Sequence, residues 1–216
     1  MSTCLISSLA AIVSFAAVIH AEASPGPATD ATRESNAAVS RQLDFSDQQA
    51  FEDAHRGFIA ALPDAEVIDE NGQRAWSNKP YAFLNEEQTP PSVNPSLWRQ
   101  ARLNAIHGLF RITDDIYQIR GIDLANMTIV EGKTGLIIID PLLTPATARA
   151  ALALYRQHRP DRPVVAVIYT HSHVDHFGGV KGVVSQAEVD AGAVRIYAPT
   201  GSWSMQSART SLQGTR

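Results

Sequence analysis

The stretch Thr170–Gly179, THSHVDHFGG, places three histidines and an aspartate within six consecutive positions. It directly follows residues 164–169, VVAVIY, an apolar run rich in β-branched side chains. A run of this kind predicts a strand that is buried on both faces. The histidines therefore lie where a buried strand ends, and this stretch decides both the fold class and the candidate chemistry.

The sequence just before this strand predicts a parallel pairing. Residues 144–160, TPATARAALALYRQHRP, have the spacing of a helix that begins after Thr144 and ends before Pro160. Residues 135–142, GLIIIDPL, indicate a second apolar strand. A strand–helix–strand order is typical of a crossover between parallel strands, and open α/β sheets bind ligands at the carboxyl ends of such strands. We therefore expect an α/β fold with the histidines on its ligand-binding edge.

Shorter elements are predicted further upstream. Residues 115–122 and 126–132, DIYQIRGI and NMTIVEG, predict two strands that we expect to pair antiparallel, and the α/β domain is placed at residues 111–200. Residues 45–110 predict a lead-in of helices and a hairpin. Its first helix spans residues 46–60 and is capped by Ser46, and its hairpin turns at Asn71-Gly72. Its second helix spans residues 95–110, starts with Pro95 and has His107 near its end.

The N-terminus predicts export. An apolar run from Leu5 to Ile19 precedes Ala21-Glu22-Ala23, the small-x-small pattern of a signal-peptidase site, so residues 1–23 are expected to be a signal peptide and the location periplasmic or secreted. The segment before the run lacks Lys and Arg, which leaves an uncleaved anchor as an alternative. Residues 24–44, rich in Pro, Gly, Ser and Thr at their start, predict a flexible tether.

Composition excludes several classes of function. The net charge is −4, and no block of Lys and Arg is present, which argues against nucleic acid as a partner. The single cysteine, Cys4, excludes a disulfide framework or a thiolate zinc site within this chain. A bound metal would therefore have nitrogen and oxygen ligands.

The histidine-rich stretch has the spacing of a metal site. His171 and His173, two residues apart, can converge on one cation, and Asp175 and His176 can reach a second. Imidazole and carboxylate ligands without thiolate favour Zn²⁺, with Mn²⁺ or Fe²⁺ as alternatives. Gly178-Gly179 allows the backbone to pass close to this loop.

These residues carry a resemblance to a known family. THSHVDHFGG resembles the H-x-H-x-D-H signature of the metallo-β-lactamase superfamily. The segments NPSLWRQ and YQIRGIDLANMT resemble one branch, the alkyl sulfatases. The resemblance implies an αββα fold, of which only the N-terminal half is present, and a site for two zinc ions. It also implies hydrolysis of primary alkyl sulfates, such as dodecyl sulfate, to an alcohol and sulfate. Intact relatives would form homodimers through a domain absent here.

The same resemblance implies His171 and His173 as ligands of one zinc ion and Asp175 and His176 as ligands of the other. Asn126 either faces the site or closes a turn. The family's later ligands have no counterpart, because no histidine follows His176 and the only later acidic residues, at positions 188 and 190, are expected on a helix surface.

Three interpretations follow: a zinc alkyl sulfatase, another hydrolase of this fold that cleaves carboxylic or phosphoric esters, and a truncated product without catalysis. For the isolated 216-residue chain we expect no activity. Residues 201–216 do not resemble the continuation of the family and are predicted to be a divergent tail. Codons that are permitted for these residues, when read in a shifted frame, encode a segment that does resemble that continuation. We therefore hypothesise a frameshift near Thr200, which the underlying DNA would test.

Overall fold

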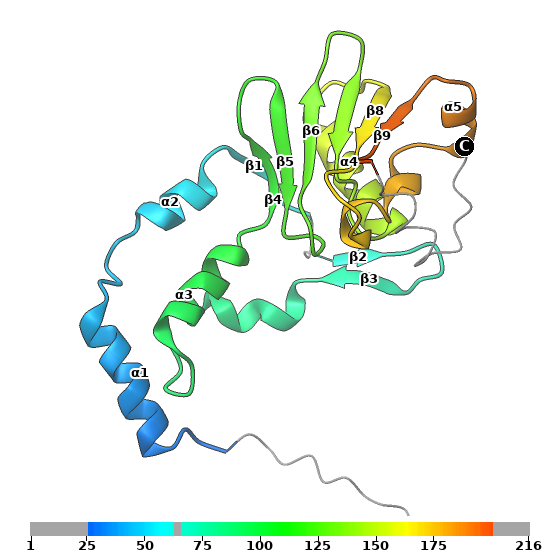
Figure 1. Cartoon of the computed structure of the whole chain (residues 1–216). Coiled ribbons are helices and arrows are strands. Elements are labelled where there is room, and N and C mark those ends of the chain that lie inside the picture. The colour runs from blue at the N-terminus through cyan, green and yellow to red at the C-terminus, as the bar shows by residue number, and fades with distance from the viewer. Residues whose placement is uncertain (1–25, 63–65, 201–216) are drawn as a thin grey trace, which may run out of the picture.

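The computed structural model describes residues 26–62 and 66–200. Within these ranges seven strands form one mixed sheet in the order β1-β4-β5-β6-β7-β8-β9 (Figure 1). The strands from β1 to β7 pair antiparallel, and β7, β8 and β9 pair parallel. Their bounds are β1 Phe58–Ala60, β4 Gly108–Arg111, β5 Ile116–Arg120, β6 Met127–Glu131, β7 Leu136–Ile139, β8 Val164–Ile168 and β9 Arg195–Tyr197.

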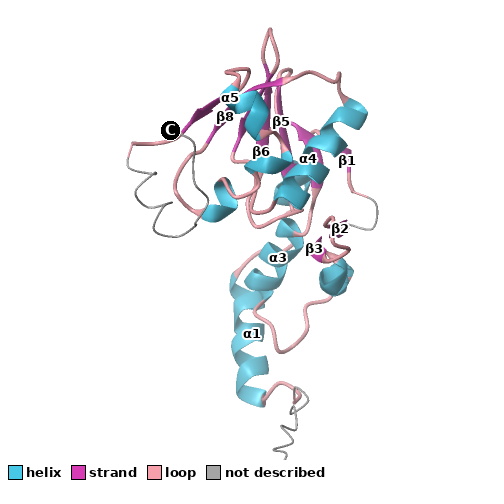
Figure 2. Ribbon diagram, turned by 90° about the vertical axis from the view of Figure 1, so that its right-hand side faces the viewer, coloured by secondary structure: helices cyan, strands magenta, loops and turns pink. Residues whose placement is uncertain are grey.

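The helices divide into two groups (Figure 2). Helix α4 packs within the body that contains the sheet, together with the short α5, whereas α1, α2 and α3 form an arm that extends from it. A separate hairpin of β2 and β3 lies beside α4. The bounds are α1 Asp30–Gln42, α2 Gln49–His55, α3 Pro95–Asn104, α4 Pro145–His158, α5 Gln186–Asp190, β2 Glu66–Ile68, β3 Arg74–Ser77, and the 3-10 helices η2 Lys79–Asn85, η3 Val174–His176 and η4 Val180–Gly182.

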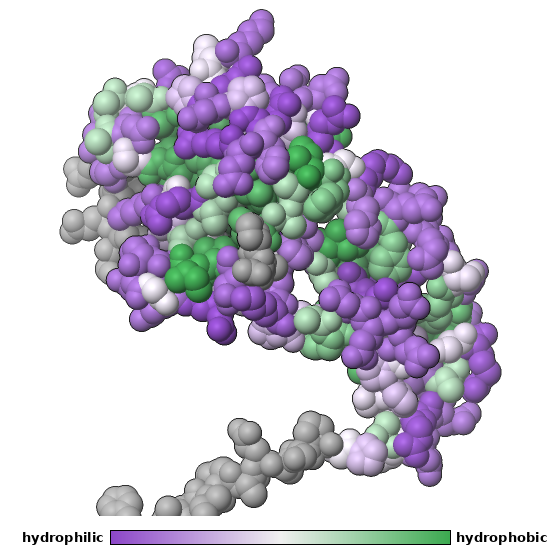
Figure 3. Space-filling view, turned by 180° about the vertical axis from the view of Figure 1, so that it is seen from behind, coloured by the Kyte–Doolittle hydropathy of each residue, from purple (hydrophilic) through white to green (hydrophobic). Residues whose placement is uncertain are grey.

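The core lies between α4 and the sheet. Alternate residues of β5, β6 and β7 are buried, as a two-residue side-chain period requires. Helix α4 adds Ala148, Ala151, Leu152 and Tyr155 to the same hydrophobic cluster. Burial of this apolar face is the main force that holds α4 on the sheet. By contrast, α1 has no buried residue, and the arm is largely hydrophilic at its surface (Figure 3).

The predicted crossover is confirmed. Thr144 caps α4 by accepting a hydrogen bond from the backbone N–H of Thr147, and the Thr147 hydroxyl accepts one from the Thr144 N–H, which forms a capping box. Pro145 occupies the first turn, where its missing N–H costs nothing. The strands on either side of α4 pair in parallel, and β5, β6 and β7 pair antiparallel as expected. The hairpin is also present. The helix beginning at Pro95 is present but ends at Asn104, and residues 108–110, at its predicted end, belong to strand β4.

Two predictions for the lead-in are wrong in part. Ser46 does not cap α2, which begins after Gln48, because the Ser46 hydroxyl instead donates to Asp44. Phe58–Ala60, predicted as helix, is strand β1, since Gly57 has a φ of 74° and ends the helical course of the chain. Strand β1 then pairs with β4, so both belong to the sheet that was predicted to start at residue 111.

The predicted tether also differs. Residues 30–42 form helix α1, whose first turn is capped by Thr29 through the N–H of Thr32. The Asn36 side chain donates to the carbonyl of Pro91 at 2.9 Å, which ties α1 to the loop before α3. The predicted signal peptide and the predicted divergent tail lie outside the described residues. Within the part of the chain that is described, no helix is both long enough and apolar enough to cross a bilayer.

Candidate metal centre

The candidate ligands and the residues that hold them lie in loops at one edge of the sheet, where the carboxyl ends of three strands meet. Strands β5 and β7 both run antiparallel to β6, and β8 runs parallel to β7. The carboxyl ends of β5, β7 and β8 therefore share one edge, and the loops at residues 121–126, 140–144 and 169–176 follow them. The predicted ligands all lie in the last of these loops, partly within η3.

The three histidines of this loop are close together. The ring centroids of His171 and His173 are 4.7 Å apart, and those of His171 and His176 are 4.0 Å apart. The carboxylate of Asp175 lies 3.4 Å from Nε2 of His176. The structure thus brings together the side chains that the sequence indicated, although His173 remains exposed.

Asp140 is a further residue of this site that sequence reasoning missed. It follows β7 directly, is 7% exposed, and has a φ of 54°, a left-handed conformation that aspartate tolerates better than most residues. Its Oδ1 accepts the backbone N–H of Thr170 at 2.8 Å. Its Oδ2 accepts the Thr170 hydroxyl at 2.6 Å and Nδ1 of His176 at 2.8 Å. Asp140 therefore joins the loop after β7 to the histidine loop.

Asp123 performs a similar role for the loop after β5. It is 5% exposed, and its Oδ2 accepts hydrogen bonds from the backbone N–H of Leu143 and from the Thr147 hydroxyl. These bonds hold the loops after β5 and β7 together. Asn126, which we considered for this site, is exposed. A signal was available for Asp123, since it lies just beyond the predicted strand 115–122, which ends on the ligand-binding edge. Asp140 falls within the predicted strand 135–142, so the same signal did not single it out.

The two glycines after the histidines permit tight packing of the same loops. A Cβ on Gly178 would lie 2.3 Å from the carbonyl oxygen of Leu143, and one on Gly179 would lie 2.1 Å from that of Pro141. The backbone N–H of Gly179 donates to the carbonyl of Leu142 at 2.8 Å. The close approach predicted for this pair is therefore made to the loop after β7.

One pair of side chains in this loop, Asp175 and His176, has the spacing of two ligands of a single cation. With the proton of a neutral ring on Nδ1 of His176, Nε2 carries a lone pair that faces the Asp175 carboxylate at 3.4 Å. Two acceptors at this distance repel each other unless a cation or a proton lies between them. Nitrogen and oxygen ligands of a tetrahedral zinc ion are about 3.4 Å apart. Within the described residues, no three side chains of His, Cys, Asp or Glu converge on a single point, so the arrangement supplies a ligand pair and nearby imidazoles.

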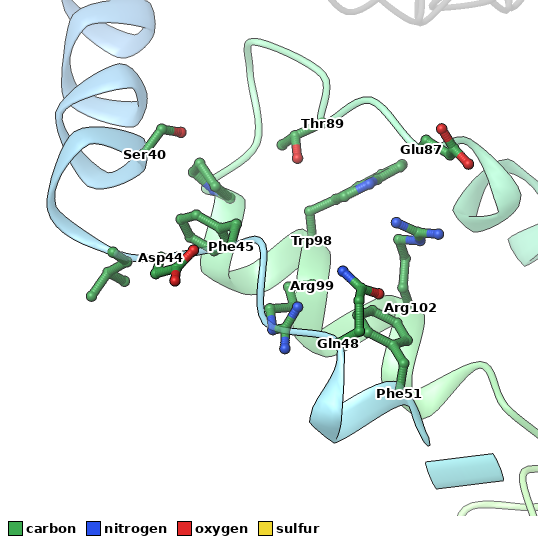
Figure 4. A pocket seen from close by; sticks show the side chains of 12 residues that line it. Ser40, Asp44, Phe45, Gln48, Phe51, Glu87, Thr89, Trp98, Arg99 and Arg102 are labelled. Atoms are coloured by element: carbon green, nitrogen blue, oxygen red, sulfur yellow. The ribbon is translucent and has the colours of Figure 1, made fainter. Parts of the chain in front are cut away.

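Two other features lie elsewhere. Glu188 caps α5 by accepting the N–H and hydroxyl of Ser185, and Asp190 accepts from Gln186, so both stay on the surface as expected. A cavity of about 440 Å³ lies in the arm, between the segment after α1 and helix α3 (Figure 4). Trp98, Arg102 and Phe51 are among the residues that line it, and none of its lining residues belongs to the three loops of the sheet edge.

Comparison with known proteins identifies the relatives of the chain. Residues 120–214 match the metallo-beta-lactamase superfamily, a range that extends into the tail predicted to diverge. A linear primary-alkylsulfatase of Pseudomonas sp. is 55% identical over 190 residues, which are 88% of this chain and 28% of that protein. An alkyl/aryl-sulfatase of Saccharomyces cerevisiae is 56% identical over 170 residues, 79% of this chain and 26% of that protein.

A solved structure has the same fold. The stereoselective inverting sec-alkylsulfatase Pisa1 from Pseudomonas sp. superimposes with a TM-score of 0.80 at 49% identity, covering 87% of this chain and 29% of that one. The chain thus spans a little over a quarter of the length of the relatives it matches. Through residues 120–214 the chain belongs to the metallo-β-lactamase superfamily, and within it to the branch that contains the alkylsulfatases.

Proposed function

We propose that this chain is part of a hydrolase that cleaves alkyl sulfate esters, such as dodecyl sulfate, to an alcohol and sulfate. The observation that carries the proposal is the cluster of His171, His173 and His176 at the carboxyl end of β8, held by the buried Asp140. The names of the relatives support the class of substrate.

Zinc is the proposed metal, with His171 and His173 as ligands of one ion and Asp175 and His176 as ligands of a second. Bound zinc would supply a Lewis acid that offsets the negative charge of the departing sulfate. The protein's own contribution is to hold the ring of His176 through Asp140 and to keep the loop in register through Gly178 and Gly179.

Metal binding by the 216-residue chain tests this ligand assignment. We expect weak zinc binding, because water would fill coordination positions that this loop does not supply. A variant with alanine at residues 171, 173, 175 and 176 should lose it in a calorimetric titration, whereas His107→Ala, in a loop before β4, should titrate like the parent. Unchanged binding in the fourfold variant would remove the assignment.

The activity is best tested in a chimera. Residues 26–200 of this chain would replace the matching segment of the Pseudomonas linear primary-alkylsulfatase, which is 55% identical. The chimera should release sulfate from dodecyl sulfate, and His171→Ala should lower that rate more than about 100-fold, beyond the usual cost of losing an outer-shell partner. A folded, zinc-loaded chimera that releases no sulfate would contradict the proposal.

Two alternatives make different predictions in the same experiment. A hydrolase of carboxylic or phosphoric esters would turn over those esters in preference to alkyl sulfates. A non-catalytic product would give a chimera that is inert toward both classes. For the isolated chain we propose that activity is absent, which an assay of the 216-residue protein with excess zinc would check.

We further propose that the protein is exported. The cleavage pattern at Ala21 and Ala23 supports this proposal. N-terminal sequencing of the mature protein should find residue 24 first. A mature form that still begins with Met1 would contradict export with cleavage.

A further inference from the structure

The histidine loop contains a chain of hydrogen bonds that begins at a single carboxylate oxygen. Oδ2 of Asp140 accepts from Nδ1 of His176 at 2.8 Å and from the Thr170 hydroxyl at 2.6 Å. The Thr170 hydroxyl oxygen in turn lies 2.9 Å from Nδ1 of His171. One buried carboxylate is therefore connected to two of the three imidazoles, to one directly and to the other through a hydroxyl.

The proton positions in this chain follow from valence. An ionised carboxylate only accepts, so both groups that contact Oδ2 of Asp140 must donate to it. A hydroxyl has one proton, and Thr170 uses it on Asp140. The contact between the Thr170 oxygen and His171 then requires that Nδ1 of His171 donates. Both rings consequently carry their proton on Nδ1 and present the lone pair of Nε2.

We propose that Asp140 and Thr170 are positioning residues that form a tautomer relay, which sets His171 and His176 together in the form whose Nε2 is free to bind a metal. The relay deepens the proposed function, because it explains how the ligand atoms are selected before metal arrives. Fixing the tautomer of a ligand histidine through its other nitrogen is a general requirement of metal sites. Here a single carboxylate would satisfy that requirement twice.

Three substitutions separate the members of the relay. Thr170→Val removes the hydroxyl at an exposed position and should release His171 alone. Thr170→Ser keeps the hydroxyl and should change neither ring. Asp140→Asn retains an acceptor for the Thr170 N–H but places an amide NH₂ where Oδ2 was. The amide would donate to the Thr170 oxygen, so the Thr170 hydroxyl would donate to Nδ1 of His171. It would also donate to Nδ1 of His176. Both rings should then carry their proton on Nε2 instead of Nδ1. Asparagine also tolerates the positive φ at this position.

The direct measurement is nitrogen-15 NMR of the histidine rings in the metal-free chain, at a pH about two units above the ordinary histidine pKa of about 6.5. The parent should show Nδ1–H for His171 and His176. Thr170→Val should give His171 the mixture of a solvated imidazole and leave His176 unchanged. A parent His171 protonated on Nε2 would overturn the relay. So would a Thr170→Val variant with no change, or an Asp140→Asn variant that alters only His176.

Zinc affinity is the second readout. Thr170→Val should weaken zinc binding about 10-fold and Asp140→Asn about 10- to 100-fold, while Thr170→Ser should match the parent. The NMR measurement needs no metal, so the two proposals can fail separately. The stated tautomers in a chain that binds no zinc would contradict the proposed ligand assignment and leave the relay standing. Circular dichroism of each variant checks that it folds. If Asp140→Asn does not fold, Thr170→Val and Thr170→Ser still test the relay, because Thr170 is exposed.

Discussion

At the scale of single residues, buried carboxylates hold the loops of this protein together. Asp123 and Asp140 are both buried, and each carboxylate ties two loops together. At the opposite edge of the sheet, the 6%-exposed side chain of Glu131 accepts hydrogen bonds from the Arg159 guanidinium at 2.8 and 3.0 Å and from the Tyr155 hydroxyl at 2.6 Å. The hydrogen bond from Arg159 holds the pKa of Glu131 below its ordinary value.

Glu131→Gln tests the stability that this charge contributes. A carboxyl group whose pKa is lower in the folded state stabilises the fold above its unfolded pKa of about 4.3, and that contribution is lost as the pH falls through the folded value. We expect the variant to lose about 1–2 kcal/mol in urea unfolding at neutral pH and to match the parent at strongly acid pH.

Glu34→Gln is the matched control. Glu34 pairs with Arg41 at the surface, where its side chain is 79% exposed, so the change should stay below about 0.5 kcal/mol. A loss for Glu131→Gln that persisted undiminished below the unfolded pKa would contradict the role of the charge.

At the scale of elements, the sequence predicts the helices and strands that are determined by local signals. The capped helix after Thr144, the antiparallel strands and the parallel crossover follow from periodicity and turn residues alone. Strand β1 could not be found in this way. Its partner β4 is some fifty positions away, and the pairing overrides a helical periodicity that continues through Phe58. The same limit hid Asp140, because its partners at Thr170 and His176 are neighbours only in the folded sheet.

Packing of the loop after β7 against the loop after β8 depends on Gly179. An alanine there would meet the carbonyl oxygens of Pro141 at 2.1 Å and Thr144 at 2.7 Å, both backbone atoms that cannot move independently. We expect Gly179→Ala to destabilise the fold by about 1–3 kcal/mol in urea unfolding.

Gly26→Ala provides the comparison, because a Cβ at Gly26 meets nothing within 4 Å. It should leave the unfolding midpoint unchanged. Equal effects of the two substitutions would show that the close approach of the loops does not contribute to stability.

At the scale of the molecule, the sheet formed by residues 26–62 and 66–200 ends in an exposed strand. Strand β9 is the last in the sheet order, and Ile196 and Tyr197 are 38% and 50% exposed. An edge strand with exposed apolar side chains is a template for pairing with another chain. We therefore expect the isolated chain to self-associate and Ile196→Lys to reduce the association, measured by light scattering across a range of concentrations.

Leu97→Lys separates edge pairing from general hydrophobicity. Leu97 lies on α3 and is 63% exposed, more than Ile196. If loss of an exposed apolar group were sufficient, this control would reduce the association as much as Ile196→Lys. The edge interpretation requires that it does not.

The order of the strands also bears on the time course of synthesis. From β4 to β9 every strand pairs with the one that follows it in the chain, so the sheet can grow one strand at a time as the polypeptide leaves the ribosome. The histidine loop takes shape only after α4 and β8 have docked. The backbone pairing of the meander of β4 to β7 uses no later strand, although its buried face is covered only when α4 docks. We expect stalled nascent chains in which the meander has just left the exit tunnel, while α4 and β8 are still inside it, to protect the backbone amides of β5 and β6 from hydrogen exchange. A nascent chain would then acquire its ligand cluster as one of the last events of its folding, on a scaffold that is already in place.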